Sequence, residues 1–240
     1  MDTNKIADKA RTQMIAHRGL SGVERENTVN AFVAACNRSY FGVECDIHVT
    51  TDNRYLVYHD DHTGRLCDKD LVIEENSFDT LRGLRIRESG GESFDDLLKM
   101  PTLEEYLHVI ARYKKTAVIE LKNQMGRESI WEVVEICRKH YTLEMIIFIS
   151  FVFENLAVLR EILPQSRLQF LTGEWTEDLP EKLREHRMDV DIGYWVLTEE
   201  NIKRFHESGI AVNCWTCDDP EAAKKLIAWG VDYLTTNILE

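Results

Sequence analysis

Gly42-Val43-Glu44-Cys45-Asp46-Ile47-His48-Val49 alternates polar and apolar side chains. On a β-strand, Glu44, Asp46 and His48 share one face, while the apolar residues share the other. Both faces of an all-parallel sheet are buried, so the acidic side chains require compensating charge. A divalent cation is the simplest compensation, and carboxylate oxygens favour Mg²⁺ or Ca²⁺ over zinc. A salt-bridged or solvent-exposed strand edge is the alternative.

The segment after this strand predicts a hairpin. Asp52-Asn53 suits a two-residue loop, because both residue types tolerate positive φ. Thr51 would then pair with Arg54, and His59 would lie directly opposite Asp46. Opposed residues share a face with Cβ atoms about 5 Å apart. This register predicts an imidazole beside the carboxylates.

Seven other short apolar runs predict strands: Met14–Ala16, Ala117–Leu121, Ile146–Phe151, Leu168–Leu171, Val190–Gly193, Ala211–Trp215 and Tyr233–Thr235. Segments of helical length separate most of these runs. Strand–helix alternation indicates a parallel sheet, and eight repeats favour an α/β fold of the closed (β/α)8 TIM-barrel type. A doubly wound open sheet is less favoured, because no glycine-rich dinucleotide loop follows the first strand.

Several helix starts are visible in the sequence. Thr28 would cap a helix over 29–38, and Thr102 with Glu105 forms a capping box before a helix over 103–113. Similar signals predict three more helices: Ser129 with Glu132 before 131–140, Thr198 with Asn201 before a helix that ends at Gly209, and Asp218-Asp219-Pro220 before one that ends at Gly230.

A chain of 240 residues suits one TIM-barrel catalytic domain spanning residues 1–240. The polar segment at about 60–100 interrupts the alternation after the second barrel strand. A segment of that length predicts a functional loop or a small inserted lobe.

Composition excludes several classes of function. The net charge of −13 argues against nucleic acid as a partner, because such surfaces need clustered lysine and arginine. The sequence shows neither a basic amphipathic helix nor an apolar run long enough to span a membrane, so we expect no stable membrane association. Residues 1–13 contain no apolar leader, and the six cysteines lack framework spacing, so we expect reduced thiols and a cytoplasmic location. The oligomeric state is not predicted.

Two further motifs with polar side chains lie at the ends of predicted strands. His17-Arg18-Gly19 offers an imidazole, a planar guanidinium suited to phosphate, and a residue that permits a sharp exit. Glu120-Leu121-Lys122 directs Glu120 and Lys122 to one side, where Glu120 can join Glu44 and Asp46 in a metal site and Lys122 can face a phosphate oxygen. A buried Glu–Lys pair is the alternative. Two histidines, His17 and His59, would supply the acid and base that phosphodiester cleavage needs.

Cys214-Trp215-Thr216-Cys217 contains a C-x-x-C spacing at the end of the seventh predicted strand. Thioredoxin-type pairs lie at a helix N-terminus after an early strand, so a redox role is not favoured. Trp215 at the mouth of a barrel can pack against a substrate, although a core tryptophan is nearly as well supported.

These residues resemble the glycerophosphodiester phosphodiesterase family. The resemblance covers essentially the whole chain and rests on motifs in register: Ile15–Gly19, Glu26-Asn27-Thr28, Glu44-x-Asp46, Thr50-x-Asp52, Val57-x-His59-Asp60, Pro101–Glu105, Glu120-Leu121-Lys122, Ile149-Ser150-Phe151, Trp215-Thr216 and Gly230-Val231-Asp232 with Thr236. Three positions depart from the family pattern: Arg25 replaces a proline, Asn53 a glycine, and Asn237 an aspartate that often follows the threonine.

The resemblance implies a TIM barrel that hydrolyses glycerophosphodiesters to sn-glycerol 3-phosphate and an alcohol. By motif match, His17 and His59 are the acid/base pair, Glu44, Asp46 and Glu120 hold one divalent cation, and Arg18 and Lys122 bind the phosphate. A related lysolipid or sphingolipid phosphodiesterase and a non-catalytic glycerophosphodiester-binding barrel are the alternatives. The intact histidine pair argues against the second.

Overall fold

Eight parallel strands form a closed ring in the computed structural model, which describes residues 2–240. The strands are β1 (Gln13–Ala16), β2 (Gly42–Val49), β6 (Thr116–Leu121), β7 (Ile146–Ser150), β8 (Arg167–Thr172), β9 (Asp189–Gly193), β10 (Val212–Trp215) and β11 (Tyr233–Thr236). They pair in the order β1-β11-β10-β9-β8-β7-β6-β2, and pairing of Ile15 with Gly42 closes the ring. All eight predicted runs are strands, and the predicted (β/α)8 TIM barrel is confirmed.

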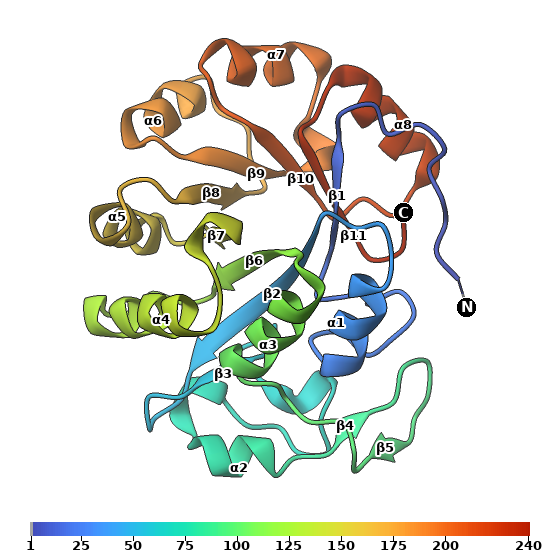
Figure 1. Ribbon diagram of the computed structural model, residues 1–240, viewed down its shortest axis with the longest axis vertical. Helices are drawn as coiled ribbons and strands as arrows, with labels where there is room; N and C mark the ends of the chain where they lie inside the picture. The colour runs from blue at the N-terminus through green and yellow to red at the C-terminus, as the bar shows by residue number, and fades with distance from the viewer. Residues whose placement is uncertain (1) are drawn as a thin grey trace.

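Seven helices lie between consecutive barrel strands in the sequence and cover the outside of the ring (Figure 1). They are α1 (Val29–Cys36), α3 (Leu103–Tyr113), α4 (Arg127–His140), α5 (Phe153–Ile162), α6 (Leu179–His186), α7 (Glu199–Glu207) and α8 (Pro220–Trp229). Their apolar stripes pack on the outward side of the strands, where Val43, Cys45 and Ile47 belong to the main hydrophobic core. Glu44, Asp46 and His48 therefore point into the barrel, as the alternation predicts.

Local capping signals fixed most helix starts. The side chain of Thr28 accepts from Ala31 N–H, the predicted capping box at Thr102 is formed, and the predicted helix start at Thr198 also carries a capping box. The predicted cap at Ser129 is wrong. The helix begins at Arg127, because Ile130 N–H donates to the Gly126 carbonyl, and Ser129 consequently lies inside the first turn.

A ninth strand, β3 (Tyr55–Val57), runs antiparallel to β2, but the predicted register is wrong by one residue. The hairpin loop contains three residues, because Thr50 N–H donates to the Arg54 carbonyl and Asn53 adopts a φ of +56°. Tyr58 rather than His59 consequently lies opposite Asp46, and its N–H donates to the Asp46 carbonyl at 3.0 Å.

The segment between β3 and α3 is more regular than its polar sequence indicates. It contains the short helices η1 (Thr63–Arg65), η2 (Ile73–Glu75) and α2 (Phe78–Arg82), and the two-stranded sheet of β4 (Ile86–Arg87) and β5 (Phe94–Asp95). A separate apolar cluster that includes Ile73, Leu81 and Met100 packs these pieces together. The segment lies beyond β3, away from α5 to α8 (Figure 1).

No helix within residues 2–240 combines the length and apolar character required to cross a membrane. All six cysteines are unpaired and buried.

Candidate active site

The carboxyl ends of the strands bring the predicted site residues together around one pocket. His17 and Arg18 follow β1, and Trp215 ends β10. A pocket of about 90 Å³ is lined by six of the eight predicted residues: His17, Arg18, Glu44, His59, Glu120 and Trp215. The remaining two, Asp46 and Lys122, form ion pairs with members of this set. TIM-barrel enzymes place their chemistry at this end of the barrel.

Three buried carboxylates form the centre of the site. Glu44, Asp46 and Glu120 are 2%, 1% and 7% exposed, and one potential ligand atom from each lies within 4.8 Å of the others. Their proximity follows from strand pairing, because Asp46 on β2 is in register with Glu120 on β6. The exposed-edge alternative for the acidic stripe is therefore wrong.

The positive charges of Arg18 and Lys122 offset the negative charge of Asp46 more fully than they offset the charges of Glu44 and Glu120. Arg18 Nε lies 3.5 Å from Asp46 Oδ2, and Lys122 Nζ lies 3.6 Å from Asp46 Oδ1 and 2.9 Å from Glu120 Oε1. Burial opposes ionisation of Asp46, but these cations hold its pKa below the usual range. Burial and the neighbouring carboxylates raise the pKa of Glu44, and burial with repulsion from Asp46 raises that of Glu120 to about 8.

Three buried carboxylates with only two nearby cations leave negative charge that a divalent cation would offset. Glu44 Oε1 and Asp46 Oδ1 are both buried without a hydrogen-bond donor. Unpartnered buried carboxylate oxygens are costly unless a cation occupies the space between them. The donors are all oxygen atoms, which suits a hard cation. The predicted metal site is thus compatible with the geometry of these three residues.

The loop after β1 places Arg18 beside the three carboxylates. Arg18 adopts a φ of +55° and Gly19 one of +78°, and this turn directs the Arg18 N–H to Glu44 Oε2 at 2.7 Å. A Cβ at position 19 would lie 2.6 Å from the Ala31 carbonyl carbon, so the close packing requires glycine. Arg18 Nε is buried and lacks a hydrogen-bond partner, which leaves a donor for a bound anion.

The Nδ1 atoms of the two histidines contact different partners. His17 Nδ1 lies 2.8 Å from Asn237 Oδ1, whereas His59 Nδ1 lies 2.6 Å from the carboxylate of Asp60, which Arg65 also contacts. Burial and the Arg18 guanidinium lower the pKa of His17 to about 4. Burial also lowers the pKa of His59, against the opposing influence of Asp46.

His59 lines the pocket although it is not paired with Asp46, as the predicted hairpin register required. Strand β3 ends at Val57, so His59 lies beyond the ladder. The imidazole of His48, which is fully buried on the inner face of β2, places Nε2 3.4 Å from the His59 carbonyl and Nδ1 3.2 Å from Glu74. His48 therefore links β2 to the segment that presents His59.

Aromatic side chains form one wall of the pocket. Trp215 packs edge-on against Phe151 and Trp195, with ring centroids 5.5 Å and 5.2 Å away. Its indole N–H donates to the Asp191 carbonyl at 3.2 Å. Phe151 and Trp195 are 47% and 58% exposed, so the wall continues to the protein surface. Trp215 lines the pocket, and its contact with a substrate stays a prediction.

Four residues of the site escaped the role assignments made from sequence. Asn27 donates to Asp46 Oδ2 at 2.7 Å, and Glu26 pairs with Arg18 at 2.8 Å. Asp191 is 1% exposed, lines the pocket and has no hydrogen-bond partner at Oδ1, while Asn237 contacts His17. The alternation Asp189-Val190-Asp191-Ile192 repeats that of β2 and was the available signal for Asp191.

Neither cysteine of the C-x-x-C pair lines the pocket: Cys214 lies on β10, and Cys217 lies in the loop before α8. The Cys214 thiol points toward the Tyr233 carbonyl at 3.7 Å, and that of Cys217 toward the Asp219 carbonyl at 3.6 Å. Burial raises the pKa of both thiols, that of Cys217 to about 11, which disfavours the reactive thiolate.

We expect the double variant Cys214→Ser and Cys217→Ser to retain kcat within about twofold, because neither sulfur faces the reacting groups. Burying two hydroxyls should instead lower stability by about 1–3 kcal/mol. Steady-state kinetics and thermal unfolding of the reduced protein measure the two effects. A large loss of kcat in a folded variant would revive a redox role.

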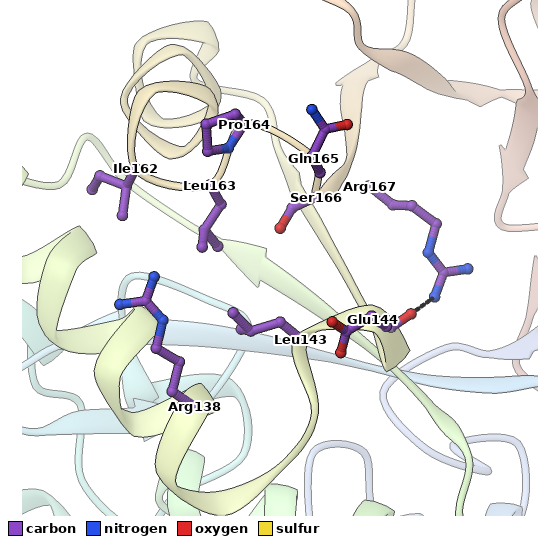
Figure 2. Close-up of a pocket in the computed structure, with 9 residues that line it drawn as sticks. All are labelled: Arg138, Leu143, Glu144, Ile162, Leu163, Pro164, Gln165, Ser166 and Arg167. Carbon is purple, nitrogen blue, oxygen red and sulfur yellow. Dashed lines mark hydrogen bonds between the residues drawn. The ribbon is translucent and has the colours of Figure 1, made fainter.

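A second hollow lies at the opposite end of the barrel (Figure 2). It is lined by Arg138 near the end of α4, by residues 143–144 before β7 and by residues 162–167, which run from the end of α5 to the start of β8. Arg167 donates to the Glu144 carbonyl at 2.9 Å across it. Neither a histidine nor a cluster of acids lines this hollow, so it offers no match to the chemistry at the carboxyl ends.

Comparison with known proteins defines the class. Residues 17–240 match the glycerophosphoryl diester phosphodiesterase family, to which the chain belongs. A glycerophosphodiester phosphodiesterase of Bacillus altitudinis is 26% identical over 94% of both chains. The chain is therefore a phosphodiesterase, as predicted.

Solved structures show the same relationship. A phosphodiesterase of Oleispira antarctica in complex with the product sn-glycerol-3-phosphate superposes with a TM-score of 0.87 at 26% identity, covering 94% of this chain and 92% of that one. A glycerophosphodiester phosphodiesterase of Parabacteroides distasonis has a TM-score of 0.80 at 28% identity, covering 99% and 94%.

Proposed function

We propose that the protein hydrolyses glycerophosphodiesters to sn-glycerol 3-phosphate and an alcohol. The observation that carries this proposal is the pocket where two histidines, Arg18 and a buried acidic triad converge. The Oleispira antarctica relative, which binds sn-glycerol-3-phosphate on the same fold, supports the choice of substrate. Release of glycerol 3-phosphate from glycerophosphocholine, measured with a coupled dehydrogenase, tests it directly.

Glu44, Asp46 and Glu120 would hold one divalent cation, Mg²⁺ or Ca²⁺. Bound there, the cation would supply Lewis-acid stabilisation of charge that develops on the phosphate oxygens. Arg18 would bind a phosphate oxygen through its Nε, which has no hydrogen-bond partner, and Lys122 would add a point charge. These two side chains provide the local positive field that an anion needs in a protein of net charge −13.

His17 and His59 would divide the proton transfers. One imidazole removes the proton from the hydroxyl next to the phosphorylated carbon of glycerol, and the oxygen forms a bond to phosphorus. The other gives a proton to the departing alcohol oxygen as its bond to phosphorus breaks. Water then opens the five-membered cyclic phosphate with the two roles reversed, and both imidazoles regain their starting protonation.

A substrate analogue with hydrogen in place of the vicinal hydroxyl should bind and hardly be cleaved. The intramolecular attack gains an effective molarity of about 10⁵ M or more, and the analogue forfeits it. Turnover of the natural and deoxy diesters, with competition measurements of their affinities, checks this expectation. Cleavage of the deoxy analogue near the natural rate would instead favour direct attack by water, with the same residues in altered roles.

The exposed aromatic wall favours a lysolipid phosphodiesterase as the second candidate. Phe151 and Trp195 extend the pocket with apolar surface on which an acyl chain could pack. Comparing kcat/KM for glycerophosphocholine and lysophosphatidylcholine separates the two activities. A barrel that binds glycerophosphodiesters without catalysis would release no product from either.

The partner that this site supports is a small molecule. A cytoplasmic location stays a prediction, which the six free thiols support, because unpaired cysteines suit a reducing compartment.

A further inference from the structure

Asn237 joins His17 to a carboxylate outside the pocket. His17 Nδ1 lies 2.8 Å from Asn237 Oδ1, and Asn237 Nδ2 donates to Asp218 Oδ2 at 2.6 Å. The Ser21 hydroxyl also donates to Asn237 Oδ1, at 2.7 Å. The loop before α8 and the end of β11 are thereby connected to the histidine that follows β1.

The direction of the amide is determined by its neighbours. Asp218 in its ionised form offers only acceptors, so the group that faces it must be the donating Nδ2 of Asn237. Rotating the amide by 180° would set Oδ1 against the carboxylate and cost the charge-assisted hydrogen bond. Oδ1 must therefore face His17.

Asp218 is itself held firmly. Its Oδ1 accepts from the Thr236 hydroxyl at 2.8 Å and from the Asn237 N–H at 2.7 Å. The neighbouring Asp219, rather than Asp218, caps α8. The hydrogen bonds of Asp218 are thus directed to the end of β11 and to Asn237.

An acceptor at Nδ1 selects one tautomer of His17. The neutral ring must carry its proton on Nδ1 to donate to Oδ1, and Nε2 then keeps a free lone pair. Nε2 has no hydrogen-bond partner among residues 2–240, and the ring lines the pocket that holds Glu44 and His59.

We propose that Asn237, oriented by Asp218, is a positioning residue that holds His17 as the Nδ1–H tautomer and so presents an unprotonated Nε2 to the substrate. The catalytic consequence rests on the proposed function, whereas the tautomer does not. The neutral amide of Asn237 contacts the His17 imidazole directly, and the Asp218 carboxylate contacts the amide rather than the imidazole.

The test replaces Asp218 by Asn, which removes the charge that orients the amide and keeps the shape of the side chain. ¹⁵N NMR of the neutral histidines reports the tautomer, with the His17 signals identified by their loss in His17→Ala. We expect wild-type His17 to be protonated on Nδ1, and Asp218→Asn to show a mixture. The variant should lose kcat by roughly 10–100-fold, the range found for hydrogen-bond partners that orient metal-bound histidines, with KM nearly unchanged.

Two further variants separate positioning from folding. Asp219→Asn removes an adjacent exposed carboxylate, retains a good helix cap and should leave kcat and the tautomer unchanged. The double variant Asp218→Asn with Asn237→Asp restores a fixed acceptor at Nδ1 and should regain the Nδ1–H tautomer and at least part of kcat.

An Nε2–H tautomer in the wild type, or an unchanged tautomer and kcat in Asp218→Asn, would overturn the proposal. Equal losses in Asp218→Asn and Asp219→Asn would also do so, since they would indicate a structural role. If the wild type fails to cleave glycerophosphodiesters, the proposed function fails, and the NMR result still decides the orientation of His17.

Discussion

Alanine at His17 or at His59 is expected to lower kcat by about 10²–10⁴-fold, the usual contribution of general acid–base catalysis. The two rings line one pocket, yet they rest on different partners, Asn237 and Asp60. Because each step of the proposed reaction needs both a base and an acid, either substitution alone should be severe. KM should change far less than kcat, since Arg18 and Lys122 remain.

Steady-state kinetics with glycerophosphocholine and circular dichroism of each variant provide the measurement. His108→Ala is the matched control, because His108 lies exposed on the outer face of α3 and should retain full activity. Near wild-type turnover in His17→Ala or His59→Ala would remove that residue from the mechanism.

Asparagine at Asp46 should have an effect at least as large, with a loss of kcat/KM of about 10³-fold or more. Asp46 is a member of the acidic triad and also contacts Arg18, Lys122 and Asn27. The substitution keeps the shape of the side chain while removing charge from the metal site and from both ion pairs. Several kcal/mol of transition-state stabilisation correspond to this loss in rate.

Chelation gives an independent test of the same site. EDTA should inactivate the wild type, and added Mg²⁺ or Ca²⁺ should restore it, while calorimetry should show that Asp46→Asn no longer binds the cation. Asp96→Asn, at an exposed position in the segment between β3 and α3, is the control and should behave as wild type. Full activity in excess chelator would remove the metal from the proposal.

Among the features that the sequence predicts correctly, most depend on neighbours along the chain. The eight barrel strands were legible because strands buried on both faces appear as short apolar runs, and Glu44 and Asp46 share a face because side chains alternate along β2. The helix caps at Thr102 and Thr198 form within one helical turn. Motifs in register along the chain also indicated the family correctly.

Features that depend on residues far apart were decided by the tertiary structure. One additional residue in the hairpin loop shifted the pairing of β3, and only the contact of His48 with the His59 backbone shows how His59 is presented. His17 and Asn237 are 220 positions apart and meet because β11 closes the ring beside β1.

The sequence by itself therefore determined the fold, the family and the chemical types at the strand ends, because alternation and capping are local. Barrel closure decided which of those groups touch. It placed Asp191 in the pocket without a partner at Oδ1 and set Asn237 between His17 and Asp218. These contacts arise from the register of strands across the ring, which no spacing along the chain specifies.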